Sequence, residues 1–70
     1  MIIVLINKDG IYVEVLAGVW IRNVAKESLA LAKQERCNVH FIFNGVHVVV
    51  NPRNTLVEIE EQYERKLKRN

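Results

Sequence analysis

The segment 39–50 constrains the fold more than any other part of the chain. It places Asn44-Gly45 between two alternating runs rich in aromatic, histidine and β-branched residues, Val39–Phe43 and Val46–Val50. Asn and Gly accept the positive φ of a two-residue type I′ turn, which is the strongest short-range signal for a β-hairpin. This turn also sets the register of the two strands. The predicted cross-strand pairs are Phe43 with Val46, Phe41 with Val48, and Val39 with Val50.

A second hairpin is predicted over residues 1–17. Residues 1–6 are aliphatic and mostly β-branched, and they end at a turn signal, Asp9-Gly10. Such a run predicts a strand with both faces buried. Loops of two, three or four residues all give acceptable apolar faces, so the sequence leaves this register open.

Two helices complete the pattern. The first is expected to begin between Val19 and Val24, with Asn23 as its N-cap, and to end near Arg36. The second is expected from a capping box, Thr55 to Glu58, to about Lys68. The residues expected on the core face of the first helix are Val24, Ala25, Ser28, Leu31 and Ala32. The apolar stripe expected on the second consists of Leu56, Ile59, Tyr63 and Leu67.

The order of elements is therefore ββαββα. We expect an α+β fold, with a four-stranded antiparallel sheet and two helices packed on one face. The chain of 70 residues is long enough for a single domain, 1–70. Within it, two ββα halves of approximately 1–37 and 38–70 resemble structural repeats.

Composition narrows the class of protein. The formal net charge is +2, well below that of a dedicated electrostatic nucleic-acid binder. The single cysteine, Cys37, cannot form an intrachain disulfide, and the first six residues lack the features of a signal peptide. No apolar run approaches the roughly 18 residues that span a bilayer. A cytoplasmic location, away from membranes, is expected.

Catalysis is not predicted. Ser28 lies on the core face of the first helix, and Cys37 follows a helix C-terminus, where the helix dipole disfavours a thiolate. The glutamates of the second helix are explained by capping and solvation, and the three glycines by turns or a bulge. We therefore expect no catalytic residue, no cofactor and no metal.

One face of the predicted sheet is a candidate interface. His40 and His47 project from the reverse face of the 39–50 hairpin on adjacent strands, within reach of a shared ligand. Half of the residues are apolar, which is difficult to hide in so small a monomer. A homodimer or larger assembly through this face is therefore expected. Its predicted interface residues are Ile3, Leu5, His40, Ile42, His47 and Val49.

A basic stripe on the first helix is the other candidate surface. Its residues recur at helical spacing and form one line along the helix. They are Arg22, Lys26, Leu29, Lys33 and Arg36. Such a stripe can dock phosphates or an acidic partner, although a solvated helix face is the favoured explanation.

Residues 23–52 resemble short proteins encoded by bacteriophages and prophages. The likeness rests on the helix Ala25–Lys33 followed by the hairpin Val39–Val50, with its Phe41-Ile42-Phe43-Asn44-Gly45-Val46 core. The resemblance implies a phage-like origin and a location in the host cytoplasm. Proteins of this kind often bind and redirect or inhibit a host factor, and the resemblance carries over no catalytic residue.

The function expected first is that of a small non-enzymatic binding protein, a phage or mobile-element accessory factor that acts on a host protein. Two alternatives stay open. One is a nucleic-acid-binding protein that uses the basic stripe. The other is a homo-oligomeric sponge for a small anionic ligand such as a nucleotide, held between protomers.

Overall fold

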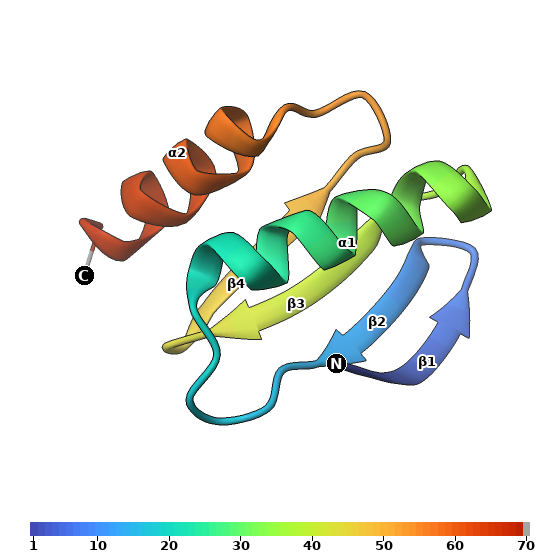
Figure 1. The fold of residues 1–70 in the computed structure, drawn as a ribbon, viewed down its shortest axis with the longest axis horizontal. Helices are drawn as coiled ribbons and strands as arrows, with labels where there is room; N and C mark the ends of the chain where they lie inside the picture. The colour runs from blue at the N-terminus through green and yellow to red at the C-terminus, as the bar shows by residue number, and fades with distance from the viewer. Residues whose placement is uncertain (70) are drawn as a thin grey trace.

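The computed structural model describes residues 1–69 and confirms the α+β order ββαββα (Figure 1). Two hairpins and two helices alternate along the chain. Their bounds are β1 Ile2–Asn7, β2 Gly10–Glu14, α1 Ile21–Glu35, β3 Val39–Phe43, β4 Val46–Val50 and α2 Leu56–Leu67.

The four strands form one sheet in the order β1-β2-β3-β4. Both hairpins are antiparallel, but the central pair, β2 and β3, is parallel, with Ile11 opposite Val39 and Tyr12 opposite His40. The sheet is therefore mixed, which corrects the expectation of an all-antiparallel sheet. The reason is the connection: α1 carries the chain back to the end of the sheet where β2 begins, so β3 runs in the same direction as β2.

The second hairpin forms with the predicted register. Asn44 and Gly45 have φ angles of 50° and 76°, as a two-residue turn of this type requires. The pairs Phe43–Val46, Phe41–Val48 and Val39–Val50 are all present. Phe41, Val48 and Val50 are fully buried, so this hairpin supplies the centre of the core.

Both helices cover the same face of the sheet (Figure 1). The side of α1 that packs on it is made of small or β-branched residues, Val24, Ala25, Ser28 and Ala32, all buried as predicted. Leu31, predicted on the same side, is half-buried. From the predicted stripe of α2, Ile59 and Tyr63 are buried and Leu56 is half-buried, but Leu67 is exposed. Tyr63 meets Phe43 edge to face at 5.5 Å, and its hydroxyl accepts a hydrogen bond from Asn44 Nδ2 at 3.0 Å. These contacts fasten α2 to the tip of the hairpin.

The two helices differ in how their N-termini are capped. In α2 the predicted capping box is present: Thr55 Oγ1 accepts from the Glu58 N–H, and Glu58 Oε1 accepts from the Thr55 N–H. In α1 the prediction of Asn23 as N-cap was wrong. Trp20 takes that position without a side-chain cap, and the Asn23 N–H donates to the Trp20 carbonyl at 3.0 Å. Asn23 is thus already inside the first turn. Within residues 1–69, neither helix combines the length and the apolarity that crossing a bilayer would require.

The first strand contradicts its predicted burial. β1 lies at the edge of the sheet, and its five aliphatic residues, Ile2–Ile6, are 49–67% exposed. Among the described elements it approaches β2 alone, because both helices lie over β3 and β4 (Figure 1). An aliphatic run that suits a central strand therefore occupies the outermost position of this sheet.

Candidate functional site

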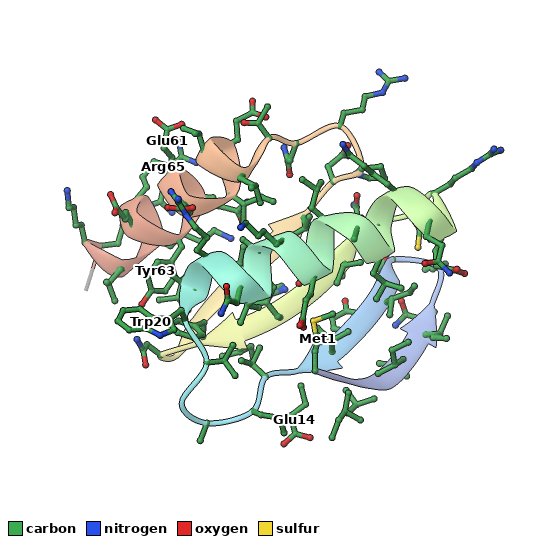
Figure 2. All side chains as sticks on the ribbon, in the orientation of Figure 1. Met1, Glu14, Trp20, Glu61, Tyr63 and Arg65 are labelled. Carbon is green, nitrogen blue, oxygen red and sulfur yellow. The ribbon has the colours of Figure 1, made fainter. Side chains whose placement is uncertain are left out.

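The face of the sheet turned away from the helices carries the candidate site, and we call it the open face. Strand alternation places Tyr12, Glu14, His40, Ile42, His47 and Val49 on this face. Glu14, at the end of β2, points away from both helices (Figure 2). Ile42, which lies in β3 of the central hairpin, residues 39–50, is 63% exposed.

A bulge at Val4 decides which residues of β1 join the open face. The register shifts between Ile3, which is opposite Val13, and Leu5, which is opposite Tyr12. Because side chains of paired residues share a face, Leu5 lies on the open face and Ile3 lies on the helix side. The predicted interface patch, which combined Ile3 with Leu5, is therefore split by the bulge. The extra residue, Val4, lines the open face in place of Ile3.

His40 is the best-covered residue of the open face, at 8% exposed. Its ring stacks on Tyr12 with centroids 4.2 Å apart and planes within 10°. Its Nε2 lies 2.8 Å from the backbone carbonyl oxygen of Asp9. A carbonyl only accepts hydrogen bonds, so this nitrogen carries the proton and the ring ties β3 to the β1–β2 turn.

His47 lies beside His40 on the adjacent strand, as the sequence predicted, and the two rings are in direct contact. Nδ1 of His40 lies 3.1 Å from Nε2 of His47, and the two rings are 5.3 Å apart. Because Nε2 of His40 is the donor to Asp9, its Nδ1 in the neutral ring is an acceptor. His47 therefore donates through Nε2 in the neutral pair, and its Nδ1 is left as an acceptor for a ligand.

The surroundings of His47 oppose its protonation. The residue is exposed as a whole, but its Nε2 edge is covered where it meets His40. This partial burial lowers the pKa of His47 below the ordinary value of 6.5, and the nearby positive charge of a protonated His40 and of Lys66 lowers it further. At neutral pH His47 therefore presents a hydrogen-bonding edge rather than a cation.

A hollow of about 460 Å³ opens beside this pair. Its walls come from all four strands and are mainly apolar, and its lining includes Glu14 but neither lysine nor arginine. The residues of the open face that line it are Val4, Tyr12, Glu14, His40, Ile42 and His47. Its size falls within the range of small-ligand and side-chain pockets, and its chemistry suits an apolar group with one hydrogen-bonding partner.

Tyr12, Val4 and Glu14 were not predicted as site residues. The sequence did not fix the register of the first hairpin, so the faces of these three residues could not be assigned. The parallel pairing that brings Tyr12 against His40 joins residues 28 positions apart in the sequence. The one available signal was Tyr12 itself, the only aromatic residue in the run Ile11–Ala17.

Four residues of the basic stripe lie on α1, whereas Arg36 is its C-cap with a left-handed φ of 56°. The members also differ in their surroundings. Lys26, Lys33 and Arg36 are exposed, whereas Leu29 is half-buried and packs against the core. Arg22 donates through Nε to Glu60 Oε1 of α2 at 3.0 Å. The stripe lies on the helix layer, on the other side of the sheet from the hollow.

The remaining candidates stay apart from one another. Ser28 is fully buried on α1, and its hydroxyl lies 3.5 Å from the sulfur of Met1. Cys37 is a half-buried free thiol at the end of α1. Over residues 1–69 the structure contains no group of three or more His, Cys, Asp or Glu side chains that could hold a metal ion.

A scan of protein-family models and searches of curated proteins and of solved structures found no match to this chain.

Proposed function

We propose that this chain is a non-catalytic binding protein that recognises a partner protein through the open face. The observation that carries the proposal is the apolar hollow beside the His40–His47 pair, with Ile42 standing 63% exposed at its edge. An exposed apolar surface on a small domain is typical of a protein-interaction site.

The chemistry of the hollow favours a protein over the two alternative ligands. A nucleic acid or a small anion requires fixed positive charge, but the hollow is lined by the Glu14 carboxylate and by a histidine whose protonation is opposed. An apolar side chain of a partner fits the aliphatic walls. A donor on that partner can bond to the free nitrogen of His47.

The likeness to phage-encoded proteins directs the search for this partner to a bacterial host. An enzyme target fits the proposal, since a small domain that covers part of a host enzyme can inhibit it without chemistry of its own. The binding energy is expected to concentrate on Ile42 and Tyr12, because central apolar and aromatic residues dominate most protein interfaces.

A matched pair of variants tests the proposal. Ile42 on the open face and Val57 on α2 are both 63% exposed, so Ile42→Glu and Val57→Glu make the same kind of change on opposite sides of the sheet. Tagged wild type and both variants are used to capture proteins from host lysate, and the captured protein is then titrated in purified form. We expect Ile42→Glu to weaken binding by at least about tenfold, and Val57→Glu to leave it unchanged. Equal binding by Ile42→Glu and wild type would contradict the use of the open face.

Heparin chromatography separates the nucleic-acid alternative from this proposal. Phosphate contacts give a steep dependence of binding on salt. If the basic stripe binds nucleic acid, the wild type would be retained on heparin at low salt, and the double variant Lys26→Glu/Lys33→Glu would not be retained. We expect weak or no retention of the wild type.

A further inference from the structure

The two edges of the sheet differ in one respect that points to a second copy of the chain. At the β4 edge, Gln62 of α2 binds Val49 twice: Oε1 accepts from the N–H and Nε2 donates to the carbonyl, each at 2.8 Å. Lys66 Nζ donates to the His47 carbonyl at 2.7 Å. Three outward backbone groups of β4, the N–H and carbonyl of Val49 and the carbonyl of His47, are thus occupied by side chains of the same chain.

The β1 edge has no such cover. Among residues 1–69, no side chain bonds to the backbone of β1, and no helix lies over it. Natural sheets protect their edges with lysine, proline or inward charges, and Ile2–Ile6 contains none of these. The bulge at Val4 is the one protective feature present, and it leaves all five side chains between 49% and 67% exposed.

The total surface area of the chain also indicates that part of its surface is uncovered. A monomer of 8.1 kDa is expected to expose about 4,500 Å², whereas this chain exposes 4924 Å². The excess of about 400 Å² is half of what each partner contributes to a stable complex of standard size, about 800 Å². Pairing of β1 with another strand would cover part of this surface, since Ile2–Ile6 are 49–67% exposed.

We propose that two copies of this chain pair antiparallel through β1 across a two-fold axis, which joins their sheets into one of eight strands. A strand of five aliphatic residues without charge is complementary to its own copy, as an isologous interface requires. Each chain has one free edge and one covered edge, so the assembly ends at the dimer and does not extend into a filament. With the axis perpendicular to the sheet, both hollows lie on the same face of the dimer.

This inference goes beyond the proposed function, and different residues test the two. Ile3 and Ile6 pair with Val13 and Ile11 and therefore lie on the helix side of β1, away from the hollow. Their exposed fractions, 49% and 67%, let the monomer accept a lysine. The variant Ile3→Lys/Ile6→Lys blocks the edge in the way that natural edge strands do, while Val4 and Ile42 keep their places.

Sedimentation equilibrium from about 1 to about 200 µM, where micromolar dimers dissociate, gives the direct readout. We expect the wild type to reach twice the 8.1 kDa of one chain, and Ile3→Lys/Ile6→Lys to remain at 8.1 kDa throughout. Val57→Lys/Leu67→Lys is the matched control, since it adds the same charge on α2, and it should still form the dimer. Ile42→Glu should also form the dimer, whatever it does to partner binding.

Circular dichroism of each variant shows that it is folded, and the single variant Ile6→Lys, at the most exposed position of β1, replaces the double variant if that one unfolds. A wild type that stays at 8.1 kDa at the highest concentration would overturn the proposal. A folded β1 lysine variant that dimerises as well as the wild type would overturn it too.

Discussion

Gln62 binds Val49 as a neighbouring β-strand would, through one accepted and one donated backbone hydrogen bond of 2.8 Å each. A carboxamide has the same donor and acceptor as a peptide group, so a single glutamine on α2 can occupy an edge position of β4. Helix α2 therefore covers the β4 edge of the sheet, and the β1 edge is left uncovered.

Removal of this glutamine should create a second free edge. Gln62→Ala leaves the N–H and carbonyl of Val49 without their partners, with an expected loss of about 1–2 kcal/mol in the free energy of unfolding. With two free edges per chain, species larger than a dimer should appear as concentration rises. Light scattering after size exclusion measures them. Gln34→Ala, at an exposed position of α1, is the control and should behave as the wild type. Indistinguishable stability and size for the two variants would show that Gln62 does not protect the edge.

Gly10 is expected to be the least replaceable glycine. Its φ is 127°, and a Cβ at this position would overlap the backbone carbonyl of Asn38, to which the Ile11 N–H is bonded. Gly18, with a φ of 83°, has nothing within 4 Å of the same added atom. Gly18→Ala should therefore cost about 1 kcal/mol of backbone strain, and Gly10→Ala about 3 kcal/mol or more. Urea unfolding of both variants compares them, and equal losses would mean that the close approach of β2 to Asn38 is easily relaxed.

The hairpin turn gives a test of backbone strain alone. Gly45 has a φ of 76° and open space around it, so Gly45→Val changes the conformational energy without a steric contact. A β-branched residue is a genuine outlier at this angle, and we expect a loss of more than about 1 kcal/mol in the free energy of unfolding. Thermal or urea denaturation of the variant measures it, and a loss within error of zero would indicate that the turn rearranges.

Acid should weaken the fold through the histidine pair. The pKa of His47 is lowered in the folded state, by partial burial first and then by His40 and Lys66, so the unfolded chain takes up this proton at higher pH than the folded one. Stability is then fully present above about pH 6.5 and falls as pH drops from there through the lowered pKa. Among the charged groups nearby, Glu14 alone lines the hollow with a negative charge.

Urea unfolding at pH 7.5 and 5.5 tests this dependence. His47→Gln keeps a donor for His40 but does not titrate, so the fall in stability between the two pH values should be smaller in this variant than in the wild type. The same pH dependence in both proteins would contradict a role for His47.

Local chemistry was sufficient to predict the second hairpin and the start of α2. Asn44-Gly45 and the Thr55–Glu58 box each determine a structure through residues within a few positions of one another. The parallel pairing of β2 with β3 depends instead on where α1 returns the chain, and no residue of either strand encodes it. For this reason the stacking of Tyr12 on His40, two residues that line the hollow, could not be predicted.

The exposure of β1 at the edge of the sheet could not be predicted for a related reason. An aliphatic run has the same composition whether it is buried by its own chain or by another one. The sequence pattern predicts burial of Ile2–Ile6, but it does not distinguish burial by the same chain from burial by another one. The bulge at Val4 added a second error, since it moved Ile3 to the face opposite Leu5.

Amide hydrogen exchange along β1 tests most directly whether this edge is where the chain meets another copy. The measurement compares the outward-pointing N–H groups of Ile2–Asn7 at high and at low protein concentration, with β4 as the internal reference. Pairing through β1 predicts slow exchange of these groups at high concentration and faster exchange on dilution, with β4 unchanged. Exchange of the outward β1 amides as fast as that of the loops at every concentration would contradict it.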